Sequence, residues 1–147
     1  MKPTRLQIET FLRRVSDLFP IPLAQKQDLS VLADKLYTYG TLCCVIQDQK
    51  ICSMAAGYTD HTLDSMGYLS VVATLPEAQR KGYSGRNIEA FLKIARDKGL
   101  RAVHLYTDKT NKSAIQMYEK AGFIPYVCEN EPRPSDVHLI CRFEEVL

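Results

Sequence analysis

The sequence lacks three features: an excess of charge of one sign, paired cysteine motifs and long apolar runs. Its 19 Lys and Arg residues nearly balance 17 Asp and Glu residues, for a net charge of +2, so no broad attraction to nucleic acid or membrane is predicted. Nowhere do about 18 apolar residues follow one another, which argues against a membrane-spanning helix. Charged residues already occur within residues 1–6, which is too early for a signal peptide. We therefore expect a soluble cytoplasmic protein with neither nucleic-acid nor membrane partners.

The cysteines also lack a recognisable pattern. Their number is odd, no pair has the CxxC spacing, and none stands at a Cys/His ligand spacing, so neither a disulfide framework nor a zinc site is predicted. Most lie within apolar stretches and are expected to be small buried residues in a reducing compartment. No metal is therefore expected. The cysteines are Cys43, Cys44, Cys52, Cys128 and Cys141.

What the sequence does contain is the material for one hydrophobic core. Its 147 residues are 46% hydrophobic and 24% charged, and a chain of this length buries roughly two thirds of its unfolded surface. There is no internal repeat, low-complexity tract or linker. Residues 1–147 are therefore predicted to form a single domain.

Apolar periodicity divides the chain into elements in the order αα-ββ-β-α-β-α-β-β. Two amphipathic helices come first, the first capped by Thr4 and ended by Pro20, the second ended by Gly40. A short polar connection then joins the first two strands as an antiparallel hairpin. The predicted helices span residues 4–19, 29–40, from the glycine turn to 99, and 111–121, and the predicted strands span residues 42–47, 51–57, 68–75, 102–107, 123–128 and 137–143.

The most informative segment is a turn of small and basic residues, Gln79–Gly85, which follows the third strand and opens the third helix. Gly82 and Gly85 let several backbone N–H groups point to one place, with the positive end of the helix dipole behind them. Arg80 and Lys81 add positive charge, so the turn predicts a diphosphate site. A simpler interpretation stays open, in which the strand-to-helix junction needs small residues for steric reasons.

A second group of residues lies on the helix predicted at 111–121. Asn111, Ala114 and Tyr118 are spaced i, i+3 and i+7, so they share one helix face and can meet one ligand. Each also has a purely structural interpretation. Asn111 can cap the helix, Ala114 can be a packing contact, and Tyr118 can be a core aromatic residue.

Together the two segments resemble the GCN5-related N-acetyltransferase (GNAT) family. Residues 72–84 are similar to the acetyl-CoA motif of that family, [Arg/Gln]-x-x-Gly-x-[Gly/Ala], which this sequence matches except for Ser84 at the last position. Residues 110–123 are similar to the family's Asn-x-x-Ala-x-x-x-Tyr-x-x-x-Gly-Phe segment. The resemblance covers residues 42–143 with the same order of elements.

The resemblance implies an α/β (α+β) fold, the acyl-CoA N-acyltransferase fold. In it one mixed, mostly antiparallel sheet is flanked by helices, and a bulged strand splays from its neighbour at the cofactor site. It implies acetyl-CoA as the co-substrate, with its pantetheine arm on the main chain of the splayed strand and its pyrophosphate in the turn. It also implies that Tyr118 protonates the departing thiolate. The residues implied to bind acetyl-CoA are Val72, Ala73, Thr74, Gln79, Arg80, Lys81, Gly82, Tyr83, Ser84, Gly85 and Asn111.

The reaction implied is direct attack of an amine on the thioester, with a small molecule or amino sugar as the acceptor. Only roughly one lysine-like amine in a few thousand is unprotonated at neutral pH, so a base is required. Asp136 and His138, on one strand face by alternation, are candidates for contacts to the acceptor. The candidates for the base, which spacing does not separate, are a water chain, Asp60, His61, Asp64 and Glu77.

Two other functions stay open on this sequence. One is a non-catalytic acetyl-CoA-binding module that regulates a partner, and the other is an acetyltransferase that acts on protein or peptide amines. A nucleotide-binding βα domain is disfavoured, because its GxGxxG turn would follow the first strand and the turn here follows the third. Exposed strands near the carboxyl end allow for a homodimer.

Overall fold

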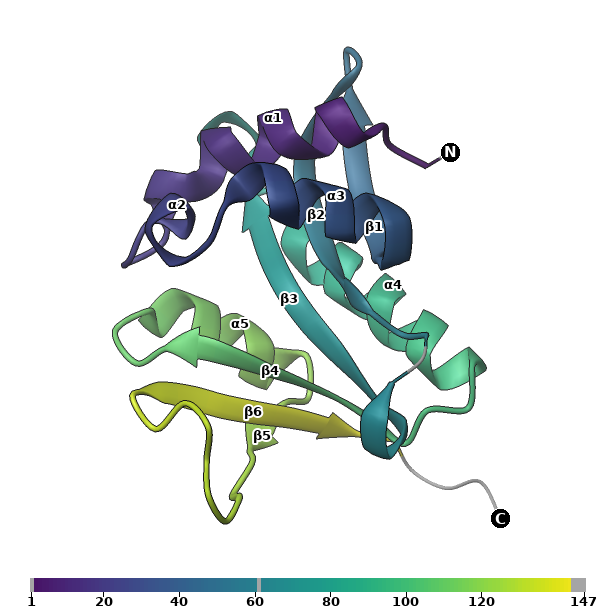
Figure 1. Cartoon of the computed structure of the whole chain (residues 1–147), viewed down its shortest axis with the longest axis vertical. Coiled ribbons are helices and arrows are strands. Elements are labelled where there is room, and N and C mark those ends of the chain that lie inside the picture. The colour runs from purple at the N-terminus through teal and green to yellow at the C-terminus, as the bar shows by residue number, and fades with distance from the viewer. Residues whose placement is uncertain (1, 61, 144–147) are drawn as a thin grey trace.

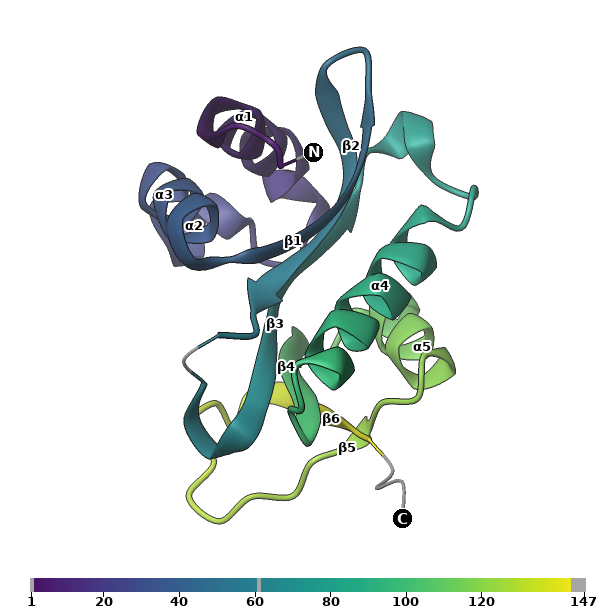
Figure 2. The same cartoon turned by 90° about the vertical axis from the view of Figure 1, so that its right-hand side faces the viewer.

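The structure, a computed structural model, describes residues 2–60 and 62–143. Its six-stranded sheet has the order β1-β2-β3-β4-β6-β5 and carries helices on both faces (Figures 1 and 2). The strands are β1 Thr41–Gln47, β2 Lys50–Tyr58, β3 Met66–Thr74, β4 Ala102–Asp108, β5 Ile124–Pro125 and β6 Asp136–Arg142. The helices are α1 Arg5–Val15, α2 Leu23–Lys26, α3 Leu29–Tyr39, α4 Tyr83–Asp97 and α5 Lys112–Lys120, with 3-10 turns at Ser16–Leu18, Leu63–Ser65 and Pro76–Ala78.

The helices cover opposite faces of the sheet and make two cores. On one face α1 and α3 pack through Phe11 and Leu36 onto β2 and β3. On the other face α4 contributes Phe91, which packs with Leu105 of β4 and Leu139 of β6. The amphipathic patterns read from the sequence therefore face the sheet, as a helix with one apolar stripe requires.

A bulge in β3 changes which side of the sheet its residues face. Ala56 of β2 pairs with Val71, but Gly57 pairs with Leu69, so Ser70 is an extra residue in β3. At this point β2 approaches β3 very closely, and a Cβ built on Gly57 would lie 2.0 Å from the carbonyl oxygen of Tyr68. Glycine is therefore required opposite the bulge.

The mixed, mostly antiparallel sheet implied by the resemblance is confirmed, and so is its splayed strand pair. The parallel pair is β3 with β4, and the other strand pairs are antiparallel. Over the described residues β3 and β4 pair only from Met66 to Tyr68, against Ala102 to His104. Beyond these positions the two strands separate (Figure 1), and one edge of β3 is left without a strand partner.

The elements at the two ends of the chain differ in detail from the sequence predictions. Thr4 caps α1 as predicted, in a capping box with Gln7, but α1 ends at Val15 and a 3-10 turn completes the segment. The strand predicted over residues 123–128 is reduced to Ile124–Pro125, and one further backbone hydrogen bond to β6 runs from the N–H of Tyr126 to the carbonyl oxygen of His138 over 2.8 Å. No helix among the described residues is long and apolar enough to cross a membrane.

Candidate functional site

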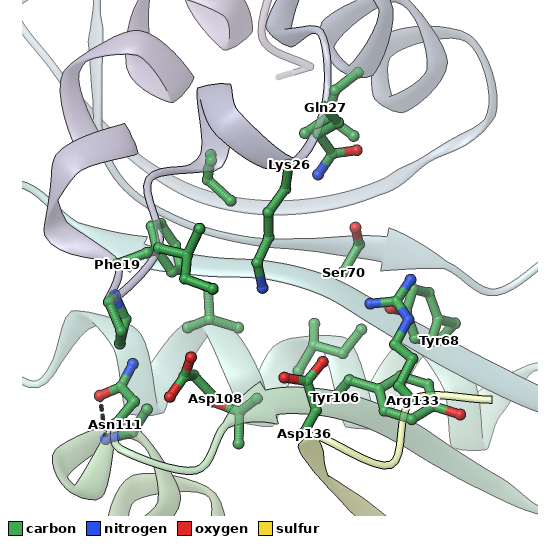
Figure 3. A pocket seen from close by; sticks show the side chains of 18 of the residues that line it. Phe19, Lys26, Gln27, Tyr68, Ser70, Tyr106, Asp108, Asn111, Arg133 and Asp136 are labelled. Carbon is green, nitrogen blue, oxygen red and sulfur yellow. Dashed lines mark hydrogen bonds between the residues drawn. The ribbon is translucent and has the colours of Figure 1, made fainter. Parts of the chain in front are cut away.

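Two adjoining pockets occupy the region where β3 and β4 separate. The pocket here called the turn pocket has a volume of about 430 Å³ and lies beside the glycine turn. The central pocket has a volume of about 440 Å³ and lies between α2 and the outer parts of β3 and β4 (Figure 3). Both pockets are lined by Phe19, Val72, Asn111 and Ala114. They therefore meet at the splay between the two strands.

The turn pocket collects most of the residues that the sequence singles out for acetyl-CoA. It is bordered by the free edge of β3, by the turn and by the start of α5. Lys81, Gly82, Tyr83 and Gly85 are not among the residues that line it. The predicted cofactor residues that line it are Val72, Ala73, Thr74, Gln79, Arg80, Ser84 and Asn111.

A chain of side-chain hydrogen bonds holds the glycine turn against the sheet. The Nδ2 group of Asn87 donates to the Oγ of Ser53 over 3.0 Å, and this Oγ lies 2.7 Å from the Oγ1 of Thr74. That Oγ1 in turn lies 2.6 Å from the Oγ of Ser84. Ser53, Thr74 and Asn87 are buried, where unpaired polar groups are costly. The serine that replaces the small residue of the family motif therefore ties α4 to the end of β3.

The backbone of the turn suits an anion. Gly82 has φ 77° and begins α4 without a side-chain cap, so N–H groups of the first helical turn remain available. A Cβ built on Gly82 or Gly85 would meet no described atom within 4 Å. Steric crowding by the protein therefore does not explain Gly85. Arg80, with φ 67°, brings a cationic side chain to the pocket.

The side chain of Tyr83 points away from the turn pocket. Its hydroxyl accepts a hydrogen bond of 3.2 Å from the side-chain amide of Gln47 at the end of β1, and its ring packs against the core beneath α1. Only the backbone of Tyr83 is therefore available to the turn.

Asn111 caps α5, as its structural interpretation suggests. Its Oδ1 accepts a hydrogen bond from the backbone N–H of Ala114 over 3.3 Å. The other end of its amide points into the central pocket (Figure 3). Capping fixes the orientation of this side chain and leaves its NH₂ group free to donate, so the two interpretations of Asn111 are compatible.

Tyr118 is a buried residue on the wall of the central pocket. It is only 7% exposed, and its ring packs edge-on against Phe123 at a centroid distance of 5.7 Å. Burial, with a smaller contribution from Tyr68, raises the pKa of Tyr118 above its ordinary value. The hydroxyl is therefore held in its neutral form and can donate a proton or hydrogen bond at neutral pH.

The central pocket is polar and carries both signs of charge. Lys26 of α2 reaches into it from one side, and Asp108 and Asp136 lie opposite at the ends of β4 and β6 (Figure 3). Hydrogen bonds from Thr110 lower the pKa of Asp108, and nearby Lys26 acts in the same direction. Arg133 lies over the ring of Tyr106, 4.9 Å from its centroid. The sequence analysis named Asp136 but missed α2 and Asp108, although a carboxylate at the end of a strand is a usable signal.

The acidic residues considered as bases lie away from both pockets. Asp60 pairs with Lys98, with 2.8 Å between carboxylate and ammonium, and Glu77 pairs with Arg14 over 2.8 Å. Asp64 lies in the 3-10 turn before β3 and lines neither pocket. His61 lies outside the described residues.

Asp136 and His138, predicted to share a strand face, have different surroundings. Asp136 lines the central pocket, whereas His138 is buried and bonds Glu131 and His104.

Comparison with known proteins gives one family. A family model described as the Acetyltransferase (GNAT) family matches residues 8–123. The mycothiol acetyltransferase of Arthrobacter sp. (strain FB24) is 42% identical over 59 residues, which are 40% of this chain and 18% of that protein. The matched stretch is thus less than a fifth of that relative's length.

Two solved structures show the same fold. The PaiA N-acetyltransferase from Thermoplasma acidophilum, in complex with coenzyme A, superposes with a TM-score of 0.70 at 13% identity and 97% coverage of both chains. An acetyltransferase of the GNAT family from Staphylococcus aureus Mu50 gives a TM-score of 0.75 at 13% identity, covering 95% of this chain and 93% of that one. At such identities the likeness concerns the fold and leaves the acceptor open.

Proposed function

Because the chain belongs to the Acetyltransferase (GNAT) family, we propose that it transfers the acetyl group of acetyl-CoA to the amine of a small molecule. The observation that carries this proposal is the junction of the two pockets at Val72, Asn111 and Ala114. A thioester held from the turn pocket would enter the central pocket at this junction. An amine bound there would meet it in a defined geometry, which is the main requirement for rapid acyl transfer.

In this proposal acetyl-CoA lies along the free edge of β3. The amides of the pantetheine arm would pair with the main chain of Val72, Ala73 and Thr74, as an added strand pairs with a sheet edge. The pyrophosphate would occupy the start of α4, where uncapped N–H groups face it and Arg80 supplies a positive charge. The NH₂ group of Asn111 would donate to the arm at the junction.

Tyr118 is proposed to protonate the thiolate that leaves the tetrahedral intermediate. In water this transfer is uphill by roughly 2 kcal/mol, because a thiol has a pKa of about 8.5 and tyrosine one of about 10. Burial raises the pKa of Tyr118, but a thiolate in the same desolvated region is destabilised as well. The donor therefore stays protonated, and the acceptor of the proton becomes more basic.

The acceptor is proposed to be a small polar amine. A volume of about 440 Å³ is within the range of small-molecule sites. Asp108 and Asp136 would attract and orient its ammonium group, which would lose a proton to solvent through a water chain before the neutral amine attacks. Lys26 and Arg133 would hold an anionic or hydroxyl-bearing group of the same molecule. The similarity to proteins named mycothiol acetyltransferase supports a small-molecule acceptor.

The proposal is tested by measuring release of free thiol from acetyl-CoA in the presence of amino sugars, amino acids, polyamines and a lysine-containing peptide. Saturable turnover with at least one small amine, and less with the peptide, is expected. Turnover with the peptide alone would favour the protein-directed alternative. Tight binding of CoA without turnover on any amine would favour a regulatory module and overturn the proposal.

A further inference from the structure

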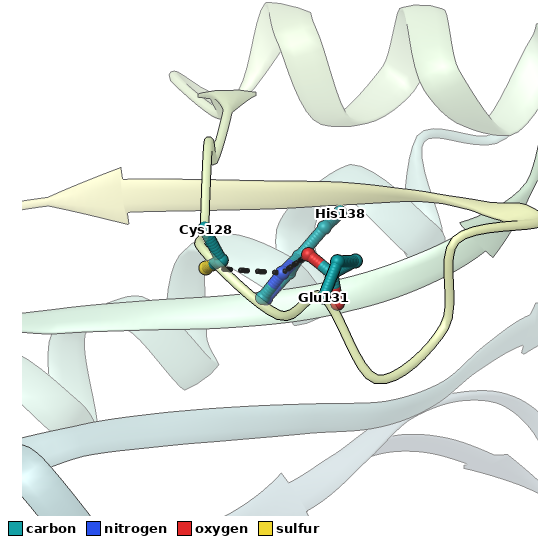
Figure 4. Close-up of side chains that lie close together, drawn as sticks. All are labelled: Cys128, Glu131 and His138. Atoms are coloured by element: carbon teal, nitrogen blue, oxygen red, sulfur yellow. Dashed lines mark hydrogen bonds and ion pairs between the residues drawn. The ribbon is translucent and has the colours of Figure 1, made fainter.

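A cluster of three side chains with metal-binding chemistry lies outside both pockets. Cys128 and Glu131 belong to the loop between β5 and β6, and His138 is the third residue of β6 (Figure 4). The Sγ of Cys128 is 3.8 Å from the Nδ1 of His138, which is 2.8 Å from the Oε2 of Glu131. All three ligand atoms lie within 4.8 Å of one another. None of these residues lines the turn pocket or the central pocket.

We propose that Cys128, Glu131 and His138 bind a divalent transition-metal ion of the zinc class, with water as a fourth ligand. A tetrahedral zinc ion has bonds of about 2.3 Å to sulfur and about 2.0–2.2 Å to nitrogen and oxygen, which separate sulfur from nitrogen by about 3.5 Å and nitrogen from oxygen by about 3.4 Å. The observed separations of 3.8 and 2.8 Å differ from these by less than ~1 Å. These two separations therefore need to change only slightly to admit the ion.

The surroundings of the three ligands match those of metal sites. The Nε2 of His138 lies 2.9 Å from the Nδ1 of His104, a partner that would fix the ring orientation while Nδ1 faces the ion. The hydroxyl of Tyr106 donates to the Oε1 of Glu131 over 2.8 Å, which leaves Oε2 for coordination. The ring of Tyr106 also stacks on that of His138, with centroids 4.1 Å apart.

Charge and protons balance in this site. A thiolate and a carboxylate together neutralise the two positive charges of the ion, and the imidazole binds in its neutral form. On binding, the Cys128 thiol loses its proton to solvent. The imidazole proton between His138 and Glu131 moves to Nε2 and points at the Nδ1 of His104, whose own proton is then on its Nε2. About one proton is therefore released for each ion bound near neutral pH.

The bound ion would link the loop between β5 and β6 to β6 itself, because its ligands come from both segments. The same loop carries Arg133, and β6 begins at Asp136, both of which line the central pocket. If the proposed function holds, the ion would position this wall of the acceptor site. Binding of the ion itself does not depend on acetyl transfer, so the two proposals can fail separately.

The test uses the full chain, stripped with a chelator, reduced and titrated with Co²⁺ and then with Zn²⁺. We expect one Co²⁺ per chain, with a near-ultraviolet thiolate charge-transfer band that Zn²⁺ abolishes. The variant Cys128→Ser should lose the band and bind Zn²⁺ at least about 100-fold more weakly, and His104→Gln should keep the band but bind Zn²⁺ about 10–100-fold more weakly. The control Cys44→Ser, which alters a cysteine of β1, should behave as the wild type.

The wild-type titration gives the decisive result, because it does not depend on how any variant folds. Absence of a thiolate band at one equivalent of Co²⁺ would overturn the proposal. So would a folded Cys128→Ser variant, checked by circular dichroism, that retains the band or the wild-type affinity for Zn²⁺.

Discussion

Replacing Tyr118 by Phe removes one hydroxyl and leaves the ring in place. The residue is 7% exposed and packs against Phe123 through its ring, so the packing that stabilises this wall is preserved. If Tyr118 protonates the thiolate, its loss should lower kcat about 10²–10⁴-fold, the usual contribution of a positioned acid. The KM for acetyl-CoA should change little, because the residues proposed to bind that substrate lie in the turn pocket.

The assay is steady-state thiol release at varied acetyl-CoA and acceptor concentrations, together with the midpoint of thermal unfolding. Tyr39→Phe is the matched control, since Tyr39 is 67% exposed on α3 and lines neither pocket. Both variants should unfold within about 0.5 kcal/mol of the wild type. Full turnover by Tyr118→Phe would refute the assignment. If kcat falls and the variant is destabilised to a matching extent, the loss of activity would be due to packing, and the assignment would also be refuted.

The raised pKa of Tyr118 adds a test in the alkaline range. Above pH about 10 the unfolded chain loses this proton while the folded chain keeps it, so the folded state binds more protons. The free energy of unfolding should therefore fall as the pH rises from about 10 toward the raised pKa. Urea unfolding at several alkaline pH values should show this loss in the wild type and a shallower one in Tyr118→Phe.

Three further predictions concern the turn and the bulge. Thr74→Val and Ser84→Ala should each lower the free energy of unfolding by about 1–3 kcal/mol in urea titrations, and the double variant should lose less than the sum, because the two hydroxyls share one bond. Arg80→Asn should raise the KM for acetyl-CoA about 10-fold or more, because a charged hydrogen bond is lost, and asparagine tolerates the positive φ at this position. The control Lys93→Gln, on the exposed part of α4, should leave this KM unchanged. Gly57→Ala should destabilise the protein by about 1–3 kcal/mol or more, since its Cβ would fall 2.0 Å from a backbone oxygen; wild-type stability in thermal unfolding would contradict the bulge geometry.

The helices and strands that carry the turn and Tyr118 were predictable, because each has a long and regular apolar pattern. The start of α5 at Asn111 and the glycine at the start of α4 follow from local capping and turn chemistry. The short helix α2 was missed, because the four residues Leu23–Lys26 are too few to show periodicity. Lys26 was missed with it.

Residue type alone did not separate surface carboxylates from those that line a pocket. Asp60 and Glu77 were reasonable bases from the sequence, yet each pairs with a surface cation away from the pockets. Asp108 was overlooked, although it stands at the end of β4 beside the splay. Whether a carboxylate faces solvent or a pocket depends on strand direction and on distant neighbours, neither of which sequence spacing contains.

The sequence by itself determined the local structures at which acetyl-CoA is proposed to bind. The turn at residues 79–85 and the helix behind Asn111 are local structures, and their backbone geometry depends on adjacent residues. Only the tertiary structure decided the rest. The central pocket needs the bulge at Ser70 and the separation of β3 from β4. The convergence of Cys128 with His138 needs the loop to fold back on β6. These contacts join residues through the register of the sheet, which long-range packing sets.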